Sequence, residues 1–329
     1  MFAGGVRLIL GLDIGGANTK AASSDGSYSR SFYLPLWKDS RLKEILEKIK
    51  EENREIEKVS VVMTGEGADC FSAKEEGIRY MRDAVASVFE DEDIYYFNLD
   101  GKFEKEIKDE KKFFSPNWLA SSVKLSENLS NFLFVDMGST TTDIIPVIDR
   151  RCLSEKTDFK RLLNGNLIYF GAFRADVSAM IDEIYIPSVD EYCRISTERY
   201  ASMADVYTIS GMIKEEDYTC ETPDGKEKSL EASKKRLARI VCCDLKELEE
   251  EDIKSMAEQV KERQLEVLGR EIENSIKRYS IDDVVIAGAG EFVVEEALEG
   301  MEVDYTSLSD IYGEEISSVF PAFAIASLL

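Results

Sequence analysis

The chain has 329 residues, enough for two domains, and its 65 Asp and Glu against 41 Lys and Arg give a net charge of −24. This charge repels nucleic acid and anionic membrane surfaces, so neither is expected as a partner. The sequence contains no histidine, which excludes Ser-His-Asp and Cys-His sites and the ordinary zinc sites with histidine ligands. Catalysis must therefore use carboxylates, Lys, Arg, Tyr, backbone amides or a metal ion bound by oxygen.

Two features indicate a cytoplasmic protein. No apolar run reaches the ~18 residues of a membrane span. The N-terminal MFAGGVRLIL lacks the basic region of a signal peptide and leads directly into a predicted strand. The oligomeric state stays open, with a homodimer as one option.

The first part of the chain predicts an α/β layer. Apolar runs and helical spacing give strands and helices in the order strand, strand, strand, helix, strand, helix, strand. Asp25-Gly26 is typical of a hairpin turn between the second and third strands. The predicted strands cover 8–15, 19–24, 28–36, 59–65 and 94–97, and the helices follow residue 41 and cover about 73–89.

The pattern then restarts with a strand at 132–139 and a hairpin partner at 141–151. Two helical stretches, a strand at 283–290 and a closing helix at 320–329 follow. We predict an N-terminal lobe over 1–128 and a C-terminal lobe over 129–329, with the final helix as a candidate to pack back on the first lobe. The stretch at about 150–230 is the least periodic and is interpreted as an insertion that shapes a substrate pocket.

The restart is an internal repeat at the level of single residues. Leu12-Asp13-Ile14-Gly15 aligns with Val135-Asp136-Met137-Gly138, so that Thr19 falls on Thr142 and Lys20 falls on Asp143. Each half has an apolar strand ending in Asp-x-Gly, a tight turn and a Thr in the returning strand. The pair is much harder to attribute to chance than either copy alone.

Both turns have the composition of a phosphate-binding site. Glycines after a strand let successive backbone amides approach an oxyanion, and hydroxyl groups add donors. Gly288-Ala289-Gly290, after another strand, has the same character, although a plain strand-to-helix turn would explain it equally well. The candidate phosphate-binding residues are Gly15, Gly16, Asn18, Thr19, Lys20, Gly138, Ser139, Thr140, Thr141, Thr142, Gly288 and Gly290.

Charged residues near the turns suggest how a diphosphate would be bound. Lys20 is predicted to contact a phosphate oxygen, and Asp13, Asp136 and Asp143 are candidate ligands of Mg²⁺. Two structural alternatives stay open: glycines that serve tight turns alone, and an ordinary exposed strand lysine at Lys20.

The segments LGLDIGGANTKAA and FVDMGSTTTDIIPV resemble the phosphate motifs of the acetate kinase, sugar kinase, Hsp70 and actin superfamily. DIGGANTK resembles hydantoinase and oxoprolinase A proteins. MTGEGADCFSAKEEG, LLNGNLIYFGAFR and EEDYTCETPDGK narrow the resemblance to an archaeal branch, the aryl-ether-forming synthases of methanofuran biosynthesis. The resemblance covers nearly the whole chain and implies two ribonuclease H-like lobes with a central cleft.

The resemblance also implies a transferase that displaces diphosphate. Family members join an aminomethyl-furan-methyl diphosphate to the phenol oxygen of γ-glutamyltyramine. Lys20 would then neutralise the leaving diphosphate, with Mg²⁺ as cofactor and no requirement for ATP. Asp136 is the first candidate for the base that takes the phenol proton, and Glu66 is the second. Arg174 is a candidate to bind the glutamyl carboxylate or the diphosphate, with a surface ion pair as its alternative.

Two other functions fit the same turns. An ATP-dependent small-molecule kinase or a hydantoinase-like ATPase would use both turns for nucleotide phosphates. A non-catalytic nucleotide-binding module would bind tightly without turnover. Dependence on a nucleotide distinguishes these two alternatives from the transferase. Hydantoinase-type relatives usually have a different residue where Lys20 stands, which disfavours ATP-driven ring opening here.

Overall fold

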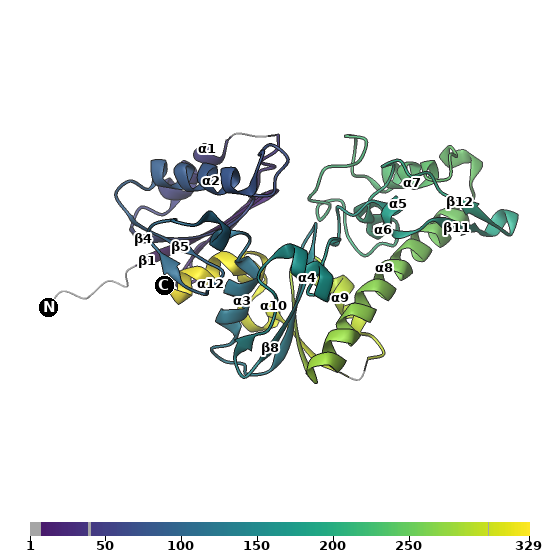
Figure 1. Ribbon diagram of the computed structural model, residues 1–329. Coiled ribbons are helices and arrows are strands. Elements are labelled where there is room, and N and C mark those ends of the chain that lie inside the picture. The colour runs from purple at the N-terminus through teal and green to yellow at the C-terminus, as the bar shows by residue number, and fades with distance from the viewer. Residues whose placement is uncertain (1–7, 39–40, 302) are drawn as a thin grey trace. The chain divides into compact units, whose positions relative to one another are not determined.

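The computed structural model describes residues 8–38, 41–301 and 303–329, within which the helices and strands form two α/β units (Figure 1). Of the described residues, those within 1–132, 145–160 and 306–329 form the first unit, and those within 133–144 and 161–305 form the second. These boundaries differ from the predicted division after residue 128, because the chain returns to the first unit twice. Residues 1–7, at the start of the segment compared with a signal peptide, lie outside the described residues.

The first unit is built on a sheet with the strand order β3-β2-β1-β4-β5-β6. The central strand β1 runs antiparallel to β2 and parallel to β4, whose partner β5 is also parallel. The strands are β1 (Leu8–Gly15), β2 (Asn18–Ser23), β3 (Ser29–Tyr33), β4 (Ile56–Thr64), β5 (Asp93–Phe97) and β6 (Phe103–Glu104).

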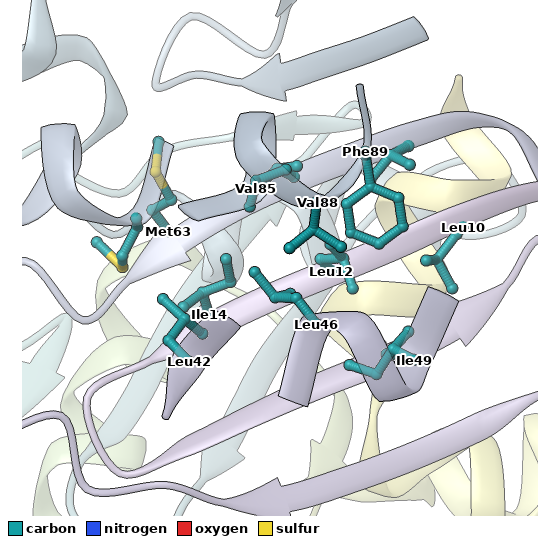
Figure 2. Packing of buried hydrophobic residues seen from close by; sticks show 14 of the residues in the cluster. Leu10, Leu12, Ile14, Leu42, Leu46, Ile49, Met63, Val85, Val88 and Phe89 are labelled. Atoms are coloured by element: carbon teal, nitrogen blue, oxygen red, sulfur yellow. The ribbon is translucent and has the colours of Figure 1, made fainter. Parts of the chain in front are cut away.

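One face of this sheet is covered by α1 (Leu42–Glu52) and α2 (Lys74–Val88), both amphipathic helices. Figure 2 shows Leu42, Leu46 and Ile49 of α1 packed with side chains of β1 and α2 in one buried cluster. Burying apolar side chains of this size contributes roughly 1.5–3 kcal/mol each. This core fixes the positions of the carboxyl ends of β1 and β4.

The other face carries α3 (Asn117–Leu125) and the closing helix α12 (Phe320–Leu328). Val62, Phe97, Ala120 and Ile325 form a cluster between these helices and the sheet. A Cβ on Gly11 would overlap the carbonyl group of Ala322, so glycine lets α12 approach β1 closely.

The second sheet has the order β10-β8-β7-β13-β14, with β9 paired to β8. Its strand β13 is parallel to β7, as β4 is to β1. The order matches β3-β2-β1-β4-β5 strand for strand, which extends the sequence repeat to the topology. The strands are β7 (Phe132–Met137), β8 (Thr142–Ile148), β9 (Arg151–Cys152), β10 (Leu167–Ile168), β13 (Asp283–Ala287) and β14 (Asp304–Ser307).

One long helix, α8 (Glu250–Tyr279), accompanies this sheet, and short elements fill the region predicted as an insertion. Helix α8 packs with α9 (Glu291–Leu298) and α6 (Met203–Ile209). The buried Arg236 bonds to the buried Asp205, which joins α6 to α7 (Leu230–Arg239). The remaining elements are α4 (Asp158–Asn164), α5 (Val177–Met180), β11 (Glu183–Ile186), β12 (Glu191–Arg194), α10 (Leu308–Tyr312), α11 (Glu314–Ser318) and the 3-10 turns Glu110–Phe113, Pro187–Val189 and Leu245–Glu247.

The described part of the chain contains no helix with the length and apolarity required to cross a bilayer.

Candidate functional site

The first predicted phosphate turn joins β1 to β2 through two glycines. A Cβ on Gly15 would lie 2.7 Å from the carbonyl oxygen of Asn18, so the turn closes this tightly only with glycine. The carbonyl oxygen of Gly16 accepts a hydrogen bond of 2.8 Å from the backbone amide of Leu36. Gly15, Gly16 and Asn18 therefore form one fixed turn at the carboxyl end of β1.

Asp13 and Lys20 lie beside this turn on adjacent strands. They are paired directly in the antiparallel register of β1 and β2, which places both side chains on the same face of the sheet. Thr64, at the end of β4, donates a hydrogen bond of 3.1 Å to Asp13 Oδ1. Burial raises the pKa of Asp13 above its ordinary value, and the charge of Lys20 and the Thr64 hydrogen bond oppose that shift.

The surroundings of Thr19 differ from those expected for its predicted role in phosphate binding. Its side chain is fully buried, and within the described residues its Oγ1 has no hydrogen-bond partner. Successive side chains of a strand point to opposite faces, so Thr19 and Lys20 face opposite sides of the sheet. The structure brings Lys20, but not the Thr19 hydroxyl, to the face that carries Asp13.

Glu66 follows β4 and is enclosed, with only 2% of its surface exposed. Ser115 donates a hydrogen bond of 2.8 Å to Glu66 Oε1, and Lys74 Nζ, at the start of α2, lies 3.9 Å from the same oxygen. Burial raises the pKa of Glu66 to about 7, whereas the Ser115 hydrogen bond, its own backbone amide and Lys74 lower it. Glu66 therefore titrates in the neutral range.

The second predicted turn, at Gly138–Thr141, is closed by a hydrogen bond of 2.9 Å from the Gly138 amide to the Thr141 carbonyl oxygen. The Ser139 carbonyl accepts hydrogen bonds from the backbone amides of Phe173 and Arg174. A Cβ on Gly171 would overlap the backbone of residues 138–140. The loop that carries Arg174 is thus held against this turn.

The glycines after β13 contact the end of β7 that leads into this turn. Asp136 is paired with Ala287, and Gly288 has φ +95°, a conformation that favours glycine. A Cβ on Gly288 would lie 2.5 Å from Asp136 Oδ1. Gly290 donates its amide to the carbonyl oxygen of Met137 over 2.8 Å. Asp136, Arg174 and the glycines at 138, 288 and 290 therefore gather at one end of β7.

Thr142 and Asp143 are occupied by contacts inside the second unit. The buried hydroxyl of Thr142 donates to the carbonyl oxygen of Phe170 over 2.9 Å. The carboxylate of Asp143 forms an ion pair with the buried guanidinium of Arg161. Both side chains therefore have partners inside the second unit, and their roles in phosphate and metal binding stay predictions.

The predicted metal ligands are divided between the units. Asp13 belongs to the first unit, and Asp136 and Asp143 belong to the second. Across the described residues, no group of three Asp, Glu or Cys side chains forms a metal site on its own. Magnesium usually binds one or two carboxylates together with substrate phosphates and water, so Asp13 and Asp136 each fit such a role.

Several residues at these turns were not predicted. They are Thr64, Lys74, Ser115, Arg161 and Gly171. Only Thr64 could have been predicted from the sequence. It stands at the end of an apolar strand directly before Gly65, much as Asp13 stands near the end of a strand before Gly15.

Two sheets with one strand order, each with an Asp-x-Gly turn after its central strand, define a duplicated ribonuclease H-like fold of the actin and hexokinase type. A nucleotide-free acetone carboxylase structure has a TM-score of 0.59 at 9% identity, covering 97% of this chain and 70% of that chain. A ROK family glucokinase from Streptomyces griseus has a TM-score of 0.50 at 12% identity, covering 98% of each chain. The predicted fold class is confirmed.

The chain belongs to the hydantoinase/oxoprolinase family, whose model matches residues 57–328. A curated relative from Methanocaldococcus jannaschii is 37% identical over 328 residues, covering 98% of this chain and 97% of the relative. It is named (4-{4-[2-(gamma-L-glutamylamino)ethyl]phenoxymethyl}furan-2-yl)methanamine synthase. A protein of the same name from Methanococcus vannielii is 32% identical and covers 62% of this chain and 94% of the relative. The predicted family is confirmed.

Proposed function

We propose that the chain is an aryl-ether-forming transferase of methanofuran biosynthesis. It would join an aminomethyl-furan-methyl diphosphate to the phenol oxygen of γ-glutamyltyramine and release diphosphate. The observation that carries this proposal is the 37% identity to a synthase of that ether over 98% of the chain. The product named for that relative contains the phenoxymethyl-furan linkage that this reaction would make.

The reaction breaks the bond between the furan methylene carbon and the bridging oxygen of the diphosphate, which departs with the electron pair. The phenol oxygen forms the new bond to that carbon and loses its proton. Charge that develops on the departing diphosphate is the main electrostatic demand, and fixed donors meet it best. We assign this task to Lys20 and to the amides of the Gly15–Gly16 turn.

We assign to Arg174 and the Gly138–Thr141 turn the binding of an anionic group of a substrate, either a phosphate or the glutamyl carboxylate. A planar guanidinium binds either group through two parallel hydrogen bonds. Mg²⁺, held by Asp13 or Asp136 together with phosphate oxygens, would supply positive charge to the diphosphate.

Glu66 is the base that we favour, ahead of Asp136. A phenol has a pKa near 10, and a general base works best with a pKa near the working pH. Burial raises the pKa of Glu66 to about 7. Asp136 lies against the Gly288 turn, which suits it better to metal or phosphate binding.

The test is to incubate the purified protein with both substrates and Mg²⁺, with and without ATP, and to measure ether and diphosphate. We expect the two products in equal amounts without nucleotide. Product formation that requires ATP and yields ADP in step would replace the transferase with a kinase or ATPase. Tight nucleotide binding without any turnover would favour a binding module.

A further inference from the structure

Ser115 has a backbone conformation that serine rarely adopts. Its φ is +48°, in the left-handed region, and it precedes Pro116 in the loop that leads to α3. The conformation costs a non-glycine residue roughly 1–2 kcal/mol. A hydrogen bond of 3.2 Å from the Ser115 amide to the Met63 carbonyl oxygen fixes the loop to the end of β4. Strained residues of this kind gather at functional sites.

The fixed loop places the Ser115 hydroxyl within hydrogen-bond distance of the Glu66 carboxylate. The donor distance to Glu66 Oε1 is 2.8 Å. The other charged groups facing this carboxylate are Lys74, 3.9 Å from Oε1, and Asp158, which is bonded to Lys74 over 3.2 Å. Glu66 Oε2 is buried and has no hydrogen-bond partner among the described residues.

The two residues differ in access to the surface. Glu66 is enclosed, whereas Ser115 is only partly buried. Of these two residues, Ser115 is therefore the one with surface that a substrate phenol can reach. A hydroxyl can accept one proton while donating its own, so it can connect two groups that do not touch.

We propose that Ser115 is a catalytic residue that passes the phenol proton to Glu66. The phenol O–H bond breaks as its proton moves to Ser115 Oγ, and the proton already on Oγ moves to Glu66 Oε1. The serine ends neutral, Glu66 ends protonated, and the phenol oxygen is free to attack the methylene carbon. This inference rests on the proposed function, because it needs a phenolic substrate.

Two serine variants separate the hydroxyl from the backbone. Ser115→Ala and Ser115→Gly both remove the relay, but glycine also relieves the left-handed strain. We expect both to lose about 100-fold in kcat, in the range of general-base contributions. Ser115→Gly should melt at a higher temperature than Ser115→Ala. Ser87→Ala, on the exposed side of α2, is the matched control and should keep full activity.

The double variant tests whether the two residues share one proton path. Adding Ser115→Ala to Glu66→Gln should cost little beyond Glu66→Gln alone. Full kcat in Ser115→Ala, recovery of wild-type kcat in Ser115→Gly, or losses that multiply in the double variant would each overturn the relay.

A second measurement works without turnover, which separates this inference from the proposed function. If the wild-type protein makes no ether, the proposed function fails, and the Ser115–Glu66 link is judged by isotope-edited NMR titration of the Glu66 carboxyl carbon. Removing a donor to the charged form should move the Glu66 pKa above its wild-type value. An unchanged Glu66 pKa in Ser115→Ala would contradict the link.

Discussion

Asp13 on β1 and Lys20 on β2 are cross-strand neighbours, paired in register on one face of the sheet beside the Gly15–Gly16 turn. In the second repeat, Asp143 occupies the position equivalent to Lys20 and forms an ion pair with Arg161. The duplicated backbone thus carries opposite charges at equivalent positions. Lys20 is half-buried beside the turn, whereas Asp143 is occupied by a buried partner.

Lys20→Met keeps the length of the side chain and removes its charge. If Lys20 stabilises the departing diphosphate, kcat should fall about 100-fold, which corresponds to about 3 kcal/mol of lost transition-state stabilisation. Steady-state kinetics and circular dichroism on the same samples measure this. Lys58→Met on β4 is the matched control, since Lys58 lies over the ring of Tyr95 and away from the turn. Full activity in a folded Lys20→Met variant would remove Lys20 from the mechanism.

Glu66 gives the stability of the protein a defined dependence on pH. Its pKa is raised to about 7 in the folded protein. The proton is therefore bound more tightly in the folded than in the unfolded state, so this stabilisation is complete below the unfolded pKa and is lost as pH rises through 7. Relative to Glu66→Gln, the free energy of unfolding of the wild type should fall by about 3 kcal/mol between pH 4 and 8.

Urea denaturation of both proteins across this range provides the measurement. Parallel pH dependences in the two proteins would show that Glu66 ionises normally. In kinetics, the wild-type rate should rise as pH passes about 7, because the base acts in its charged form.

Asp136→Asn keeps the shape of the side chain and removes its charge. If Asp136 holds Mg²⁺, activity should fall at least 100-fold at low Mg²⁺ and recover in part at high Mg²⁺. Raising the pH should not restore it. Titrations of the rate against Mg²⁺ and pH distinguish the outcomes. Recovery only as pH approaches the pKa of the phenol would instead make Asp136 the base.

Asp143→Asn tests the structural role of the second-repeat aspartate. Removing its charge takes away the carboxylate that balances the buried Arg161 guanidinium, which costs about 3–5 kcal/mol of stability. We expect a lower urea midpoint, with the specific activity of the folded fraction nearly unchanged. If the variant is as stable as the wild type but loses activity that added Mg²⁺ restores, Asp143 is a metal ligand instead.

The sequence was sufficient to predict what depends on local patterns. The strands that carry Asp13 and Asp136 near their carboxyl ends, the glycine turns and the repeat can be predicted because short-range spacing encodes them. The partners of these groups are not. Ser115 lies 49 residues from Glu66 and Arg161 lies 18 residues from Asp143, so both contacts depend on how distant segments pack. The enclosure that raises the pKa of Glu66 is likewise a property of packing.

The boundaries of the two units show the same limit. The strand pattern predicted where the second repeat begins, and the final helix was named as a candidate to pack on the first lobe; in the structure, 306–329 belongs to the first unit. The return of 145–160 to the first unit was not predicted. The contact of Gly11 with the backbone of Ala322, which holds the final helix against β1, is likewise encoded by no local pattern.

The central claim is that the ether oxygen comes from the phenol while diphosphate leaves intact, without nucleotide. The most direct test uses γ-glutamyltyramine labelled with a heavy oxygen isotope in its phenol group, together with the furan-methyl diphosphate, Mg²⁺ and no ATP. We predict that mass spectrometry will find the label retained in the ether, with one unlabelled diphosphate released for each ether formed. An absolute requirement for ATP, or an ether that lacks the label, would contradict the account.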